Sequence, residues 1–149
     1  MKFVSVFVLV IMSGCANRST YLSIYNADYS TGDGYTYRIL ENSVTVIESY
    51  GEIDSKPKIV WCRKFSDSPY LNYLCNLDTN IFFSNYRNSS VQDGLQLSFS
   101  FTKKKKKYQT HVSNYYSPQI DSIVTYVNLL VPERYRIWYD KEKLTEFND

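Results

Sequence analysis

Leu95-Gln96-Leu97-Ser98-Phe99-Ser100-Phe101-Thr102 is the stretch that decides the fold of this chain. Apolar side chains occupy every second position and polar side chains the positions between, and an extended chain points such neighbours to opposite sides. The pattern therefore predicts a strand with one buried and one solvated face. A run of lysines leads from it to a second strand, from about Lys106 to Asn114, so we expect a β-hairpin.

A helix is predicted directly after this hairpin. Ser117-Pro118 offers a cap residue and a proline suited to the first turn, and Asp121 lies where negative charge stabilises a helix N-terminus. The apolar residues recur at helical spacing as Ile120, Ile123, Val124, Val127, Leu130 and Val131. Pro132 ends this helix, and Tyr135–Tyr139 is predicted as a final strand.

Three strands and a helix are predicted before the hairpin. The strands are rich in β-branched or aromatic residues and cover Tyr35–Leu40, Val44–Tyr50 and Lys58–Phe65. A helix is expected to begin at Ser66-Asp67-Ser68-Pro69, and its apolar stripe reaches Phe82 with an interruption at Asp78. The order βββαββαβ, with short turns between strands, predicts an α+β fold. We expect an antiparallel sheet of about five to six strands with two helices on one face.

The N-terminal segment has the composition of an export signal. Lys2 precedes nine apolar or small residues, 3–11, and the segment ends in Met12-Ser13-Gly14-Cys15. It is too short to span a bilayer comfortably as a permanent helix. These fifteen residues resemble a bacterial lipoprotein signal peptide, whose lipobox ends in two small residues and an invariant cysteine. Met12 stands where leucine is usual.

This resemblance implies cleavage before Cys15 and a diacylglycerol thioether on its sulfur. The mature protein would then be attached to a membrane of a bacterial cell envelope by two or three acyl chains such as palmitate, because one chain alone binds only marginally. Ala16-Asn17-Arg18 contains no aspartate that would resemble an inner-membrane retention signal. The resemblance therefore implies the outer membrane, on its periplasmic face, if the cell is Gram-negative.

The expected organisation follows from this segment. Residues 1–14 form the signal peptide, 15–33 a lipidated N-terminus and tether, 34–140 a single globular domain, and 141–149 a charged tail. The tether is rich in Ser, Thr, Asn and Asp, and it leaves room for a short edge strand at Leu22 to Tyr25.

Cysteine usage agrees with export, because Cys15 would carry lipid and Cys62 and Cys75 would remain as a pair. Two interpretations of this pair stay open. A disulfide would contribute on the order of 3 kcal/mol in the chain-entropy model. Alternatively, the two residues are buried free thiols that pack as small hydrophobes.

Charge and histidine content narrow the chemistry. The formal net charge of +2 argues against binding to nucleic acid, which normally requires a strongly basic face. His111 is the only histidine, so no site with two histidine ligands can be assembled, and we expect no metal or cofactor. By its position in a strand, His111 is expected on a sheet face rather than in a catalytic centre.

Two features suggest recognition. The run Lys103, Lys104, Lys105, Lys106 and Lys107 could contact an anionic surface, whether lipid headgroups, lipopolysaccharide phosphates or an acidic partner. It could equally be a solubilising turn that discourages edge-to-edge strand pairing. The 15 tyrosines suit recognition surfaces as well as ordinary packing, and they cluster at Tyr21, Tyr25, Tyr29, Tyr35 and Tyr37 and at Tyr115 and Tyr116.

We therefore expect a membrane-anchored protein with a small non-catalytic binding domain, such as an inhibitor or immunity-type protein with an envelope protein as partner. An inhibitor should present a rigid, exposed aromatic or acidic protrusion. One alternative is a structural or assembly accessory of an envelope complex, which should expose a broad apolar patch. A second alternative is a carboxylate-dependent hydrolase of wall or glycan, since Glu48, Glu52 and Asp54 lie close together in the sequence.

Overall fold

The structure is a computed structural model that describes residues 20–28, 31, 33–50, 56–65, 69–91 and 94–145. Within these residues the chain forms a mixed sheet of seven strands and three α-helices, which confirms the α+β class. The strands are β1 (Tyr21–Ala27), β2 (Gly34–Leu40), β3 (Ser43–Ser49), β4 (Lys58–Lys64), β5 (Tyr86–Arg87), β6 (Gln96–Lys103) and β7 (Lys106–Ser113). The helices are α1 (Pro69–Asn76), α2 (Pro118–Leu130) and α3 (Lys141–Thr145), with 3-10 helices η1 (Thr79–Phe83) and η2 (Glu133–Tyr135).

The strands lie in the order β4-β3-β2-β1-β6-β7-β5. Neighbouring strands are antiparallel except β5, which pairs in parallel with β7 through Tyr86 and Val112. The expected antiparallel sheet of five to six strands is therefore wrong in strand number and in this last pairing. The β6–β7 hairpin is confirmed, with Gln96 opposite Ser113 and Lys103 opposite Lys106.

The expected tether over 15–33 is wrong for its second half, because β1 is a central strand. Tyr21–Ala27 pairs with β2 on one side and with β6 on the other. Leu22 and Ile24 are fully buried, while Tyr21 and Tyr25 alternate with them on the opposite face. Pairing with both neighbours therefore places β1 inside the sheet and not at its edge.

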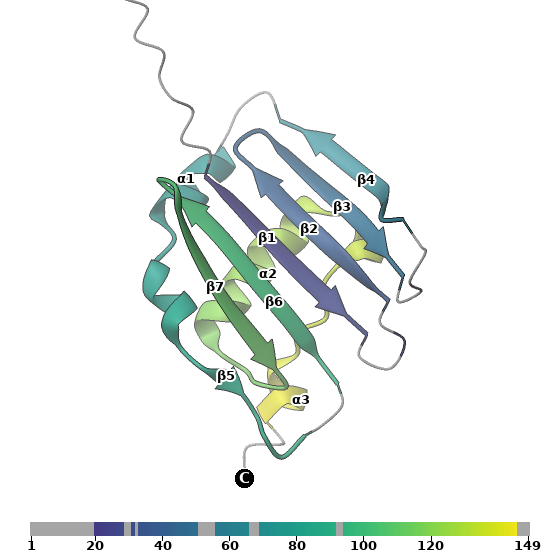
Figure 1. The fold of residues 1–149 in the computed structure, drawn as a ribbon, viewed down its shortest axis with the longest axis vertical. Coiled ribbons are helices and arrows are strands. Elements are labelled where there is room, and N and C mark those ends of the chain that lie inside the picture. Colours follow the sequence, from purple (N-terminus) through teal and green to yellow (C-terminus); the bar gives the residue numbers. More distant parts are fainter. Residues whose placement is uncertain are drawn as a thin grey trace, which may run out of the picture.

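The hydrophobic core lies between the sheet and α2, which runs behind the sheet in the view of Figure 1. The predicted strand contributes Leu97, Phe99 and Phe101, and these side chains are 0–1 % exposed. The predicted apolar stripe of α2 is buried against them. The other face of the sheet is polar and uncovered, as the alternation in β6 predicts.

Two C-terminal expectations are wrong. Tyr135–Tyr139 forms no strand, because the side chain of Asn128 binds both backbone groups of Ile137: Ile137 N–H donates to Oδ1 at 2.8 Å and Asn128 Nδ2 donates to the carbonyl at 2.9 Å. The expected charged tail begins instead with α3, whose Leu144 is 2 % exposed. The buried side chain of Leu144 thus packs α3 against the domain.

Candidate binding surface around η1

The 3-10 helix η1 is the most distinctive surface element of the described chain. Asp78 begins it, because its Oδ1 accepts a hydrogen bond from the backbone N–H of Asn80 at 2.9 Å. Phe82 is buried and stacks on Phe101 with ring centroids 5.4 Å apart. The next residue, Phe83, points to solvent and is 75 % exposed. A buried neighbour therefore fixes the position of an exposed aromatic ring.

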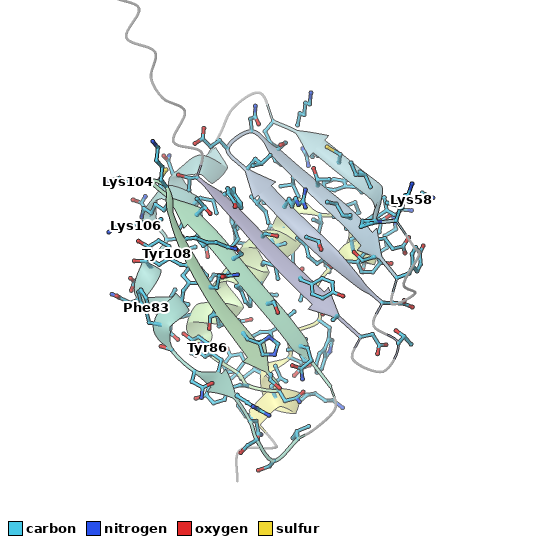
Figure 2. The ribbon with its side chains drawn as sticks, in the orientation of Figure 1. Lys58, Phe83, Tyr86, Lys104, Lys106 and Tyr108 are labelled. Carbon is cyan, nitrogen blue, oxygen red and sulfur yellow. The ribbon has the colours of Figure 1, made fainter. Side chains whose placement is uncertain are left out.

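Phe83 also rests against the sheet. Its ring meets Tyr108 of β7 edge-on, with centroids 5.9 Å apart. Figure 2 shows Phe83 and Tyr108 along the same edge of the molecule, below Lys104 and Lys106. Edge-to-face contact is a favourable aromatic geometry. Phe83 is thus an exposed aromatic side chain with one ring contact to the sheet.

A groove runs beside η1, between α1 and the start of α2. It consists of two adjoining hollows of about 640 and 390 Å³, which share Asp78, Ile81, Pro118 and Gln119. Exposed amides dominate its polar lining, from Asn72, Asn76, Asn80, Asn85 and Gln119. Each amide offers donors and an acceptor together, which matches the peptide groups of a polypeptide backbone.

Two of the tyrosines that line the groove, Tyr73 and Tyr116, make ring or hydroxyl contacts with α2. Tyr73 stacks on Tyr126 with centroids 3.9 Å apart, and its hydroxyl lies 3.4 Å from Ser122 Oγ. Burial raises the pKa of Tyr73 above its ordinary value, so this hydroxyl stays neutral at physiological pH. At the other hollow, the Tyr116 hydroxyl donates to Asp121 Oδ2 at 3.2 Å. We call Phe83 and this groove together the η1 surface.

The groove carries little charge. Asp78 is the one carboxylate among the described residues that line it, and none of these residues is basic. Among the suggested acids, Glu48 lies away from the groove in β3, where Tyr35 and Tyr50 donate hydrogen bonds to it. Glu52 and Asp54 lie outside the described residues. The structure therefore brings no pair of the suggested carboxylates together in the part it describes.

The five lysines lie at the tip of the β6–β7 hairpin. Lys104 and Lys105 form the turn, and Lys104 to Lys107 are exposed. Lys103 is half-buried, and its Nζ donates to the backbone carbonyl of Leu77 at 3.4 Å. The turn is thus tied to the segment between α1 and η1.

Cys62 and Cys75 are free, exposed thiols in the structure, so the bridge is not formed there and the expectation of buried thiols is wrong. Cys62 faces the uncovered side of the sheet, where its Sγ accepts from Thr45 Oγ1 at 3.6 Å. Cys75 belongs to α1, whose Leu74 is buried in the core on the covered side. The two thiols therefore lie on different sides of the sheet.

His111 is a sheet-face residue. Its Nε2 lies 2.8 Å from Gln96 Oε1 and its Nδ1 lies 3.1 Å from Ser98 Oγ, on the uncovered face. Both ring nitrogens are engaged in structural hydrogen bonds. Cys15 and the lipobox Met12-Ser13-Gly14-Cys15 lie outside the described residues, so the lipid anchor stays a prediction.

Among the described residues, no helix has the length and apolar character needed to cross a bilayer. The same residues contain no cluster of three or more His, Cys, Asp or Glu side chains suited to a metal ion. No family model, curated protein or solved structure matches the chain. The residues of the η1 surface are therefore the basis on which a binding role can be proposed.

The sequence carried one signal for the groove that our reading of the pattern missed. Asn72 and Asn76 are four positions apart, which places both amides on one side of α1, and Asn80 follows in η1. Only Tyr115 and Tyr116 of the groove were among the suggested recognition residues. The sequence does not predict that the amides of α1 and the tyrosines before α2 line one groove, because these two segments are far apart in the chain.

Proposed function

We propose that this chain is a lipid-anchored protein of a bacterial cell envelope whose domain binds a protein partner through the η1 surface, as an inhibitor or immunity-type protein does. The observation that carries the binding part is Phe83, which is 75 % exposed on η1, the helix whose Asn80 and Ile81 line the amide-rich groove. Large aromatic side chains supply much of the binding energy in protein interfaces. The lipobox ending in Cys15 supports the anchor.

The groove supports a protein partner by its polarity. Side-chain amides from Asn76 and Gln119 can pair with the backbone of an extended segment, and the single carboxylate of Asp78 favours a neutral or weakly basic one. A glycoside hydrolase would require two carboxyl groups at a set separation. Within the described residues, the large exposed hydrophobic side chains lie on separate elements, such as Ile59 on β4, Phe83 on η1 and Leu129 on α2, which gives no support to an assembly accessory.

Site-specific photocrosslinking in intact cells tests the binding surface. Phe83 is replaced by the photoreactive analogue p-benzoylphenylalanine, and Leu129, which is equally exposed at 75 %, is replaced in a matched control. We expect one discrete crosslinked product from position 83 and none from position 129. Adding Asn72→Ala and Asn76→Ala should reduce this product several-fold, because both amides line the groove and both side chains are exposed. Equal products from both positions, or none from either, would refute the η1 surface.

The anchor is tested separately by comparing the parent chain with Cys15→Ser. We expect the parent to be cleaved before Cys15, to carry the mass of a diacylglycerol group, and to require detergent for extraction. The variant should lose the acyl mass and the processing. If both forms are processed, located and extracted alike, the lipoprotein assignment is wrong, whatever the crosslinking shows.

A further inference from the structure

The lysine turn adopts a backbone conformation that its residues disfavour. Lys104 has φ 51° and Lys105 has φ 69°, so both lie in the left-handed region. Two-residue hairpin turns of this type are normally built from Asn-Gly or Asp-Gly. At positive φ the Cβ atom of other residues comes too close to the backbone, which Gly avoids and Asn and Asp tolerate best. Neither position carries the residue that would suit the turn best.

Electrostatics opposes the same arrangement. Lys103 and Lys106 stand directly opposite each other across the two strands, and like charges in that position destabilise a hairpin. The carbonyl of Leu77 offsets part of this repulsion by binding Lys103. The four remaining ammonium groups, on Lys104 to Lys107, are exposed. A bound anionic surface would relieve the repulsion, and strain of this kind is typical of functional positions.

The lysine turn lies at the end of the sheet where β1 begins. Tyr21, the first residue of β1, pairs with Thr102, and Lys103 follows immediately. Figure 1 shows the start of β1 and the β6–β7 turn at the same end of the sheet, with α3 at the other end. Four residues lie between Cys15 and Thr20, so five steps of a fully extended chain can place the Cα atom of Thr20 no farther than about 18 Å from that of Cys15.

The remaining charge of the chain favours one orientation. The formal net charge is +2 for the full chain and +1 after the proposed cleavage removes Lys2, and without the five lysines the cleaved chain would carry −4. Lys64, at the end of β4, lies at the same end of the sheet as the turn, since it pairs with Ser43, and Glu41 is the acidic residue of the adjacent β2–β3 turn. An anionic bilayer therefore attracts this end of the domain and weakly repels the rest.

We propose that Lys104 to Lys107 dock the domain onto the anionic phospholipid headgroups of the membrane that holds its acyl anchor. The inference rests on the proposed lipid anchor at Cys15 and adds the orientation of the domain. The hairpin tip would meet the headgroups, and the η1 surface would stand at the side of the domain, open to a partner. Lys103 joins the two, because it ties the turn to the segment that leads into η1.

Amine labelling of the full acylated chain tests the docking. The protein is reconstituted into vesicles of phosphatidylcholine alone or of phosphatidylcholine with phosphatidylglycerol, and acetylation of each lysine is measured by mass spectrometry. Lys58 is the internal control, because it is exposed and lies on the opposite edge of the sheet (Figure 2). We expect labelling of Lys104 to Lys107 to fall several-fold relative to Lys58 in the anionic vesicles, and high salt to abolish the difference.

A pair of charge-matched variants completes the test. Lys104→Asn with Lys105→Gly removes two charges and suits the turn, whereas Lys141→Gln with Lys143→Gln removes two exposed charges from α3 at the other end of the sheet and keeps Lys58 as the internal control. We expect the first variant to lose most of the protection of Lys106 and Lys107, and the second to keep it. Equal labelling of the tip in both vesicle types, or equal protection in both variants, would overturn the docking. The intact mass of each sample reports whether Cys15 is acylated. A chain without the lipid anchor is therefore distinguished from an acylated chain whose lysine turn does not bind the membrane.

Discussion

The side-chain hydroxyl of Tyr139 accepts a hydrogen bond from the backbone N–H of Ser117, the residue that precedes α2, at 2.9 Å. The same hydroxyl donates to the backbone carbonyl of Tyr115 at 2.8 Å, and its ring stacks on Tyr116 with centroids 5.6 Å apart. Ser117 turns its own hydroxyl to Gln119 instead of capping the helix. The C-terminal segment thus holds the start of α2, and with it one wall of the groove.

We predict that Tyr139→Phe destabilises the domain by about 1–3 kcal/mol. The change keeps the ring but leaves two half-buried backbone groups, the Ser117 N–H and the Tyr115 carbonyl, without their partner. The measurement is the urea midpoint of unfolding. Tyr50→Phe is the control, because Tyr50 is 45 % exposed and its hydroxyl donates to a side-chain carboxylate, that of half-buried Glu48. Equal losses in both variants would contradict the role of Tyr139.

A second prediction concerns alkaline pH and Tyr37. Burial raises the pKa of Tyr37 to about 12 from an ordinary value of 10.0. The unfolded chain therefore releases this proton first, so the contribution of Tyr37 is complete below pH 10 and is lost as the pH rises towards 12. Two units correspond to about 2–3 kcal/mol.

Tyr37→Phe should consequently flatten the fall of stability in this range. Urea unfolding from about pH 8 to about pH 12 measures the slope directly, since each unfolding free energy reports proton binding in the two states. The variant loses the phenolic hydroxyl at every pH, so only the pH dependence is diagnostic. A slope that matches the parent would show that Tyr37 ionises alike in both states.

A third prediction separates stability from docking at the lysine turn. Lys104→Asn with Lys105→Gly should raise the free energy of unfolding by about 1 kcal/mol or more, because both positions have positive φ. Thermal unfolding in membrane-free buffer measures it. Lys106→Asn with Lys107→Gly is the comparison, since these positions belong to β7 and should become less stable. If the Lys104→Asn, Lys105→Gly variant is no more stable than the parent, the two positive φ angles do not strain the turn.

How far the sequence predicts this fold depends on whether a segment carries its own pattern. The alternation at Leu95 to Thr102 predicted a strand, and the apolar stripe of α2 predicted a helix. In both segments the buried residues recur at the period of the element itself, so neighbouring positions are enough to recognise it. In β1 only Leu22 and Ile24 are fully buried, and polar residues rich in Ser, Thr, Asn and Asp surround this short segment in the sequence, so it was predicted as part of a tether. Pairing with β2 on one side and with the distant β6 on the other makes β1 a central strand, and the segment alone does not record the pairing with β6.

The reverse error occurred at Tyr135–Tyr139, where aromatic and β-branched residues suggested a strand. The backbone of Ile137 is bound by Asn128 instead, and a side chain nine positions earlier cannot be read from local propensity. The candidate site was only partly predictable for the same reason. Asp78 was noticed as an interruption, but the structure was needed to show that it begins η1 and turns Phe83 outward.

The fourth prediction concerns the loop that leads into β6. Gly94 has φ +127°, a conformation that side chains rarely adopt, and a Cβ there would collide with Oδ1 of Asn114. Asn114 cannot move freely, because it is 3 % exposed and its backbone N–H donates to Leu95 O at 3.1 Å. We therefore expect Gly94→Ala to cost about 1–3 kcal/mol, measured as a lower melting temperature. Ser84→Ala, at an ordinary φ of −84°, should change it little, and a Gly94→Ala protein as stable as that control would show that the loop accommodates a side chain.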